Sequence, residues 1–212
     1  MADNYLDKKM EEYRAKPDRR TPVRSGQTLT KLLLKNRSVR GYDPSFVVRE
    51  DQMRSILEVA TRVPSAMNRQ GLRFRPVLAD EAEQVLDGFH LGGALPELGL
   101  PFAGSEPHAF IIVCAACEPD NYLYIDLGIT AQSMLLRAAE LGLNGIMVGS
   151  FDKRRLQERF RLPSLPLLLI ALGRGTERIE LTEIGAEESH AYYRREGVHY
   201  VPKVRLEELI LK

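Results

Sequence analysis

The chain has 212 residues, 44% of them hydrophobic, and this length predicts one globular domain over residues 1–212 with one substantial core. Its 30 basic and 29 acidic residues leave a formal net charge of +1, which argues against nucleic acid and acidic membrane surfaces as partners. There is no N-terminal apolar segment and no apolar run near about 20 residues, so we expect a cytoplasmic protein without a membrane span.

The first part of the chain predicts helices. Residues 4–16 are highly charged and predict at most a peripheral helix. Thr28 is suited to cap a short helix over residues 29–36, whose leucines need burial. The stretch 50–63 carries an apolar stripe at helical spacing and ends before Pro64; the stripe consists of Met53, Ile56, Leu57 and Ala60.

Two strands and a long loop are predicted next. Residues 73–79 and 108–117 read as strands, with a helix over 80–89 between them. The loop at 91–107 is rich in glycine and proline, and its length makes it a candidate lid or entrance to a site.

The second half is predicted to hold the central helix. Residues 124–145 are almost free of charge after Asp126, so the helix over 125–142 should be nearly enclosed. The segments predicted after it are a short strand at 145–151, a surface helix at 152–160, a buried strand at 165–175, a strand at 177–184, and an extended aromatic and basic tail with a terminal helix at 189–212.

Cysteine and histidine offer little chemistry here. Cys114 and Cys117 lie in an apolar, strand-like run, and we interpret both as buried, inert thiols rather than as a redox pair. The four histidines are scattered without ligand spacing, so no metal site is predicted.

Two basic motifs admit both an ordinary and a functional interpretation. Arg37, Ser38 and Arg40 follow a leucine-rich helix, where basic residues also offset the helix dipole. Lys203 and Arg205 are two residues apart, so in an extended strand they would lie about 6.6 Å apart on one face. That spacing suits two contacts to one phosphate, and a solvated charge pair is the alternative.

The stretch VPSAMNRQ, residues 63–70, contains more than a helix end requires. A proline and a serine suffice to stop a helix, yet Asn68 and Gln70 follow directly before a strand. Their carboxamides each provide a donor and an acceptor, which suits a ligand whose edge displays both.

The order of the motifs resembles that of the FMN-dependent nitroreductase family. In this chain they are RSVRGY, PSAMNRQ before a strand, a buried helix ending AAELGLNG, then VGSFD and finally KVR, from about residue 29 to 205. The tail GVHYVPK resembles one subgroup of that family. The resemblance implies an α+β, nitroreductase-like fold with a mixed, mostly antiparallel sheet flanked by helices and a buried central helix. It also implies a homodimer with the C-terminal arm exchanged between subunits.

The resemblance assigns FMN contacts to the first basic motif and to the turn. Arg37, Ser38 and Arg40 match the segment that grips the flavin phosphate and the pyrimidine edge of the ring. In the turn, Asn68 matches the amide that binds the ring's polar edge, with Gln70 in support. The turn residues that match a segment lying against the isoalloxazine from the other subunit are Pro64, Ser65 and Ala66.

Further matches lie in the second half. Gly149 and Ser150 match the place where a backbone N–H approaches flavin N5, and Lys203 with Arg205 matches the basic pair on the phosphate. The chain departs from the family pattern in two places. Asn36 stands where a further arginine is usual, and residues 71–72 are Gly-Leu instead of Pro-Trp.

The function implied is a ping-pong oxidoreductase. NADH or NADPH would reduce FMN and leave, and a nitroaromatic, quinone or similar electron-poor acceptor would then be reduced on the same flavin face, with no catalytic side chain required. Arg69, Arg73 and Arg75 are candidates for an NADPH phosphate contact that the sequence cannot assign.

Two alternatives remain open at this point. One is another FMN enzyme on the same scaffold, with a dedicated metabolite or the flavin itself as substrate. The other is a module that binds flavin or a partner protein without catalysis. The aromatic tail AYYRREGVHY is too apolar for a free terminus, which favours packing of the arm on a partner subunit.

Overall fold

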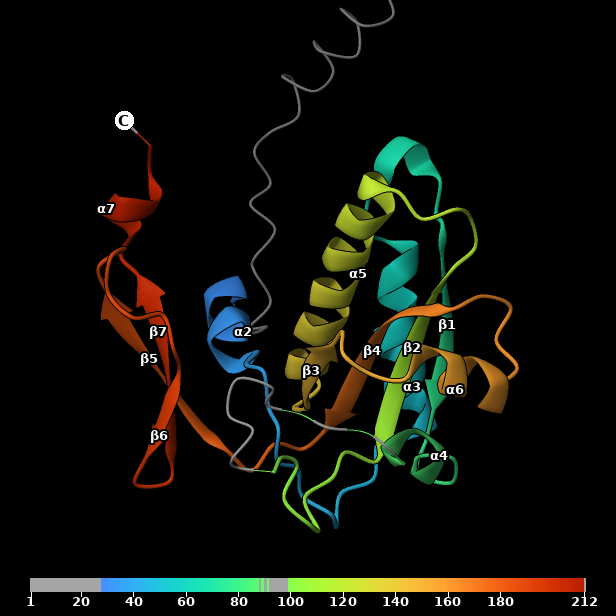
Figure 1. The fold of residues 1–212 in the computed structure, drawn as a ribbon, viewed down its shortest axis with the longest axis horizontal. Coiled ribbons are helices and arrows are strands. Elements are labelled where there is room, and N and C mark those ends of the chain that lie inside the picture. Colours follow the sequence, from blue (N-terminus) through green and yellow to red (C-terminus); the bar gives the residue numbers. More distant parts are fainter. Residues whose placement is uncertain (1–27, 88, 90, 92–98, 212) are drawn as a thin grey trace, which may run out of the picture.

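The computed structural model describes residues 28–87, 89, 91 and 99–211 (Figure 1). Its elements are α2 (Leu29–Lys35), α3 (Glu50–Leu57), the 3-10 helices η1 (Glu58–Thr61) and η2 (Ala66–Asn68), β1 (Leu72–Val77), α4 (Glu83–Leu86), β2 (Ala109–Ala115), α5 (Asn121–Glu140), β3 (Asn144–Val148), α6 (Lys153–Arg159), β4 (Pro166–Gly173), β5 (Arg178–Ile184), β6 (Tyr193–Arg195), β7 (Val198–Val204) and α7 (Leu206–Leu209). The helix expected at 4–16 and residues 92–98 of the candidate lid lie outside the described residues.

Four strands form an antiparallel sheet in the order β1-β2-β4-β3. All seven residues of β2 are buried, because helices cover both faces of the sheet, and this explains why its sequence is one continuous apolar run. The sheet and its flanking helices confirm the α+β class.

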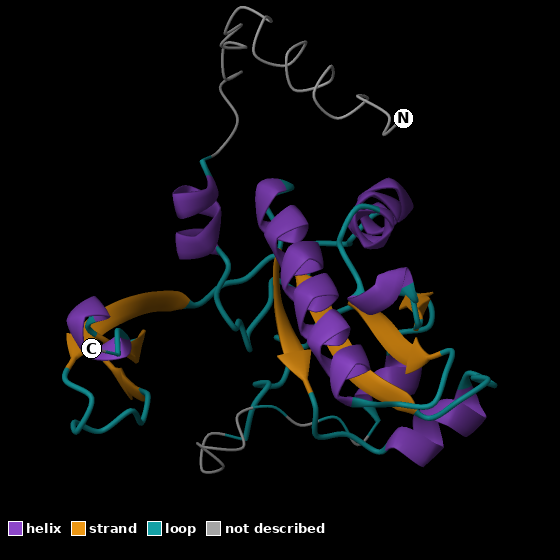
Figure 2. Ribbon diagram, turned by 90° about the horizontal axis from the view of Figure 1, so that it is seen from above, coloured by secondary structure: helices purple, strands orange, loops and turns teal. Residues whose placement is uncertain are grey.

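The side chains of β2 alternate between two layers of the core. Ile111 and Val113 pack on the side of α3 and α5, whereas Phe110 and Ile112 pack on the side of α4 and α6. Each of these side chains is almost fully buried, which contributes about 1.5–3 kcal/mol apiece. The longest helix, α5, lies across one face of the sheet (Figure 2). Among the described residues no helix is both long and apolar enough to cross a membrane.

Helix α5 begins at Asn121, earlier than expected, because the Asp120 carboxylate accepts the Leu123 N–H at 2.8 Å and caps it. One face of α5 packs on the sheet, as predicted for a central helix. The helix is not nearly enclosed within this chain, however, since several of its apolar side chains are exposed: Tyr122, Tyr124, Ile125 and Ile129.

Helix α2 forms where expected, and the Thr28 hydroxyl accepts the Lys31 N–H at 3.4 Å. Its leucines are not buried within the chain, contrary to expectation. Leu29, Leu33 and Leu34 are 62%, 41% and 59% exposed. Apolar side chains are therefore exposed on α2 and on the N-terminal half of α5, two helices that lie next to each other (Figure 1).

The last strands form a second, smaller sheet, order β5-β7-β6, with β5 and β7 parallel. We call residues 178–209 the arm. It stands apart from the main sheet, with α2 beside it (Figures 1 and 2). The parallel pair makes the strands of the fold mixed but mostly antiparallel, as predicted. The single-domain assignment and the exchange of the arm between subunits stay predictions.

The cysteines differ from each other in burial. Cys114 lies in β2, where burial raises the pKa of its thiol, but Cys117 is exposed. The prediction of two buried thiols is wrong for Cys117 because β2 ends at Ala115.

The neighbourhood of Cys117 also explains why residue 71 is a glycine. A Cβ at Gly71 would lie 2.9 Å from both the Cys117 sulfur and a Leu123 methyl carbon, so a larger residue would displace its neighbours.

Candidate functional site

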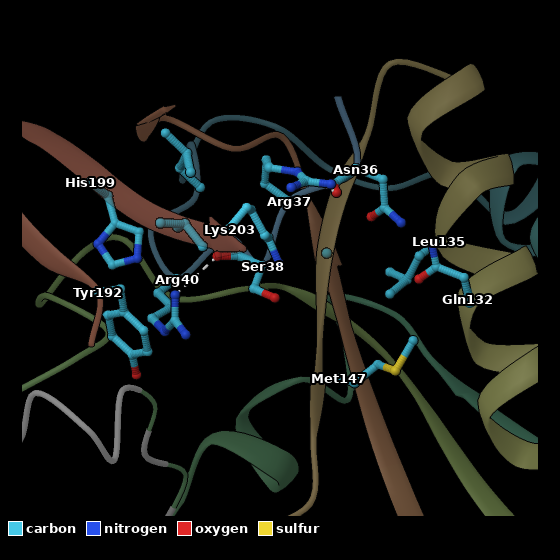
Figure 3. A pocket seen from close by; sticks show the side chains of 13 residues that line it. Asn36, Arg37, Ser38, Arg40, Gln132, Leu135, Met147, Tyr192, His199 and Lys203 are labelled. Carbon is cyan, nitrogen blue, oxygen red and sulfur yellow. Dashed lines mark hydrogen bonds between the residues drawn. The ribbon is translucent and has the colours of Figure 1, made fainter. Parts of the chain in front are cut away.

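The first cavity with predicted site residues lies between the segment after α2, helix α5, strand β3 and the arm. This arm cavity has a volume of about 420 Å³ and is lined by Asn36, Arg37, Ser38, Arg40, Gln132, Leu135, Gly145, Met147, Ile179, Tyr192, His199, Val201 and Lys203 (Figure 3). The fold therefore brings Lys203 together with the 37–40 segment from the opposite end of the described chain.

Local hydrogen bonds hold the 37–40 segment. Arg37 donates to the Asn36 and Leu33 carbonyl oxygens at 2.7 and 2.5 Å, so it caps the end of α2, as the ordinary interpretation of this motif predicts. It nevertheless lines the cavity, and partial burial lowers the pKa of its guanidinium. Arg40 donates to the Ser38 carbonyl oxygen at 3.1 Å, and its buried Nε has no hydrogen-bond partner among the described residues.

Glu177 joins this segment to the arm. Its carboxylate accepts the backbone N–H groups of Arg40 and, at 3.2 Å, of Gly41, and it also pairs with the guanidinium of Arg194 on β6. The Glu177 side chain is 9% exposed, so these interactions are shielded from solvent. The position of the arm is thereby tied to the backbone of the 37–41 segment.

Alternation along β7 places His199, Val201 and Lys203 at the arm cavity. His199 is 3% exposed, and its Nδ1 has no hydrogen-bond partner among the described residues. Its ring lies 5.1 Å from that of Tyr192, which in turn lies 5.1 Å from the Arg40 guanidinium carbon. Figure 3 shows this group on the arm side of the cavity, opposite α5.

The second cavity lies at the other end of α5, behind the 63–70 turn. This turn cavity has a volume of about 230 Å³ and is lined by Leu57, Ala60, Thr61, Val63, Pro64, Ser65, Gln70, Gly71, Leu72, Arg73, Phe74, Asp126 and Thr130. Asp126 is 3% exposed, and its Oδ1 accepts the Ala66 N–H at 2.9 Å. Its buried Oδ2 has no partner among the described residues. The carboxylate therefore holds the turn against α5.

The turn itself has an unusual backbone. Met67, Asn68 and Gln70 have φ values of 53°, 54° and 48°, in the left-handed region that residues with a Cβ seldom adopt. The Gln70 carboxamide donates to Asn68 Oδ1 at 3.2 Å, and the Gln70 N–H donates to the Ser65 hydroxyl at 3.2 Å. Strain of this kind persists where surrounding contacts determine the conformation, and it often marks functional sites.

The two cavities have no lining residue in common. Helix α5 contributes Asp126 and Thr130 to the turn cavity, and Gln132 and Leu135 to the arm cavity. Within one chain, the predicted phosphate contacts and the predicted ring contacts therefore lie in separate places.

Five predicted site residues line neither cavity, and two of them, Ala66 and Asn68, are in the 63–70 turn. Gly149 and Ser150 are exposed after β3, and a Cβ at Gly149 would meet nothing within 4 Å. Arg205 donates to the Glu208 carboxylate at 2.9 Å, and the structure does not bring it together with Lys203 at the arm cavity. Their contacts to FMN stay predictions.

Sequence reasoning missed three residues of these sites. Asp126 was noted only as a charge on an apolar helix, although an acidic residue on the buried face of such a helix signals a partner. His199 was visible in the tail, where its spacing of four from Lys203 places both on one face of a strand. Glu177 carries no such signal, because its role depends on tertiary contacts. Among the described residues no cluster of three or more histidine, cysteine or acidic side chains is placed to hold a metal ion.

Comparison with known proteins supports the family resemblance. The model of the nitroreductase family matches residues 33–91 and 95–174, more than half of the chain. The match stops before the arm, so the arm residues at the arm cavity lie beyond it.

Individual relatives are distant in sequence. A Bacillus subtilis protein named "Putative NAD(P)H nitroreductase YdgI" is 23% identical, with 74% of this chain and 88% of that protein aligned. The structure of a nitroreductase family protein from Streptococcus pneumoniae aligns with 87% of this chain and all of its own, with a TM-score of 0.62 and 18% identity. An FMN-dependent nitroreductase from Clostridium difficile aligns with 69% of this chain and 87% of its own, with a TM-score of 0.56 and 23% identity.

These structures share the fold of the described residues, and the family model covers the segment after α2, the turn and helix α5. The resemblance found in the sequence motifs is thereby confirmed: the chain belongs to the nitroreductase family.

Proposed function

We propose that the protein is an FMN-dependent NAD(P)H oxidoreductase that reduces nitroaromatic compounds, quinones or similar electron-poor acceptors by a ping-pong mechanism. Family membership supports the reaction class. The names of the relatives from Bacillus subtilis and Clostridium difficile, which mention NAD(P)H and FMN, agree with it.

The observation that carries the proposal is the composition of the arm cavity. Arg37, Arg40 and Lys203 provide three cations at its wall, and Ser38 adds a hydroxyl. Charged donors of this kind bind phosphate oxygens strongly. The buried Arg40 Nε also lacks a partner within the described residues, and an unpaired buried donor is costly unless a ligand or water satisfies it. The donor set therefore fits the phosphate end of FMN.

The turn fits the other end of the cofactor. Asn68 presents a carboxamide that Gln70 orients, and the Ala66 backbone is held by Asp126. In the proposal these residues bind and orient the polar edge of the flavin ring, with Pro64 and Ser65 beside it. When bound, FMN would supply hydride transfer from the nicotinamide to the acceptor. No side chain is assigned as an obligatory acid, because solvent can supply protons.

We further propose a two-fold homodimer in which the turn of one subunit faces the arm cavity of the other. Two observations support it. The two sets of predicted contacts are separate within one chain, and apolar side chains are exposed along α2 and α5. An apolar surface of this kind is typical of an interface between subunits. A cytoplasmic location and the choice between NADH and NADPH remain predictions.

The test begins with the visible spectrum of the purified protein, which should show bound flavin that is released as FMN on denaturation. Apoprotein should regain FMN, and NADH or NADPH should bleach the flavin anaerobically. Addition of a quinone or a nitroaromatic compound should then restore the colour. A protein that binds no FMN would refute the proposal, as would bound flavin that neither nicotinamide reduces.

A further inference from the structure

The charged groups that act on the His199 imidazole are mostly cationic. They are Arg40 after α2 and Arg194 on β6, together with one carboxylate, Glu177, before β5; Arg37 and Lys203 line the same cavity. None of the cavity's described lining residues is acidic. Glu177 already accepts two backbone N–H groups and pairs with Arg194. The cluster is therefore short of negative charge, and an anionic ligand would complete it.

The imidazole of His199 is a buried polar group within this cluster. Val201 and Lys203 follow it on the same side of β7, so all three line the arm cavity. A buried imidazole nitrogen without a partner costs free energy that a bound ligand can recover. Figure 3 shows the His199 ring next to that of Tyr192, with Arg40 nearby.

Arg205 has a different environment. Its guanidinium is exposed and paired with Glu208, which raises the pKa of the Arg205 guanidinium. The Ala186 N–H, and then Arg205, lower the pKa of the Glu208 carboxyl. It does not line the arm cavity. Of the described basic side chains on the arm, His199 and Lys203 are thus the ones that line the cavity together with Arg40.

We propose that His199, and not Arg205, shares the phosphate group of FMN with Lys203 and Arg40. The inference rests on the proposed function, because it requires FMN as the ligand of the arm cavity. It adds to the phosphate site an arm residue, His199, which lies beyond the part of the chain that the family model matches.

Phosphate binding beside His199 should change the protonation of its imidazole. Burial, and then the charges of Arg40 and Arg194, lower the pKa of His199, so the imidazole is neutral near pH 7.5 without ligand. A phosphate dianion beside it raises that pKa, and binding therefore takes up a proton. FMN affinity should accordingly rise as pH falls toward the pKa of His199 in the free protein.

The first experiment titrates apoprotein with FMN and with riboflavin, which lacks the phosphate. His199→Gln should weaken FMN roughly tenfold and leave riboflavin nearly unchanged, whereas Arg205→Gln should leave both unchanged. Wild-type FMN affinity in His199→Gln overturns the proposal, and so does selective loss of FMN in Arg205→Gln. Equal loss of both flavins in a folded His199→Gln protein also overturns it.

The second experiment does not depend on the folding of a variant. Calorimetry of wild-type apoprotein at pH 7.5, in two buffers of different ionisation enthalpy, counts the protons bound with FMN. At this pH the phosphate is already largely dianionic, since its second pKa is about 6. We expect net uptake with FMN and none with riboflavin. Equal uptake with both flavins overturns the proposal, and apoprotein that binds neither flavin refutes the proposed function itself.

Discussion

The arm cavity and the turn cavity differ in chemistry. The arm cavity is lined by three cations and an imidazole, together with apolar side chains, from both ends of the described chain. The turn cavity is lined mainly by apolar and small side chains from one continuous region and α5, around the carboxylate of Asp126. FMN is divided in the same way, into a dianionic phosphate and a largely apolar ring with a polar edge. Under the proposed function, each cavity would bind one end of the cofactor, and one chain carries both sets of contacts in separate places.

The largest expected effect follows from removing charge at the arm cavity. The double change Arg40→Ala with Lys203→Ala removes two charge-assisted hydrogen bonds, each contributing about 1.5–3 kcal/mol. FMN should bind at least about 100-fold more weakly in a fluorescence titration, while riboflavin should change little. Arg54→Ala with Arg62→Ala, two exposed arginines near α3, is the matched control. Equal loss of both flavins would contradict the division between the cavities.

The second prediction concerns the apolar surface on α2. Leu34→Asp should convert the dimer into a monomer that retains little flavin, because the halves of the site would separate. The same change should alter the stability of the folded chain by less than about 0.5 kcal/mol, since Leu34 is exposed. Light scattering gives the mass, and Leu165→Asp, at a similarly exposed leucine before β4, is the control. An unchanged FMN-loaded dimer would place the interface elsewhere.

The third prediction concerns Asp126. Asp126→Leu leaves the Ala66 N–H without its acceptor, which should lower the free energy of unfolding by about 1–3 kcal/mol. FMN and riboflavin should bind more weakly to the same degree, in contrast to the arm-cavity variants, because in the proposed site the turn contacts the flavin ring. Asp126→Asn keeps an oxygen acceptor and should retain most of both properties. Denaturant unfolding and the two titrations measure these effects, and a loss confined to FMN would argue against the assignment.

The smallest effects are expected at the tip of the turn. Asn68→Ala should weaken both flavins by about 1 kcal/mol, or roughly fivefold, and shift the flavin reduction potential. Gln70→Ala should have a smaller effect, because its carboxamide acts on Asn68 and not on the ligand. If Gln70→Ala proved the more damaging change, the ligand contact would belong to Gln70.

Much of the fold could be predicted because its signals are local. The apolar run of β2, the cap at Thr28 and the low charge of α5 specify elements without reference to the rest of the chain. Burial was harder to predict. Leu34 and Ile125 look like core residues in the sequence, yet they are exposed in a single chain. The helical spacing of apolar residues predicts that a face will be covered, but it does not tell whether the same chain or a second subunit covers it.

The candidate site could be located in part from the sequence. Family motifs pointed to the 37–40 segment and Lys203, which line the arm cavity, and to the turn, of which Pro64, Ser65 and Gln70 line the turn cavity. They could not show that Arg205 would pair with Glu208, or that Glu177 would anchor the arm, because these contacts depend on how the arm folds back. His199 and Asp126 were predictable in part. The periodicity of the strand and of the helix predicts which face each residue lies on, but only the structure shows which groups surround it.

The most direct test of this account asks whether one site is built from two subunits. An arm variant, Arg40→Ala with Lys203→Ala, is co-expressed with a turn variant, Asn68→Ala with Asp126→Leu, under different tags, and the mixed dimer is isolated. Each parent dimer should bind FMN poorly. In the mixed dimer, one site combines the intact turn of the first subunit with the intact arm cavity of the second, so titration should recover one FMN per dimer with wild-type affinity. A mixed dimer without any high-affinity site would contradict the shared site.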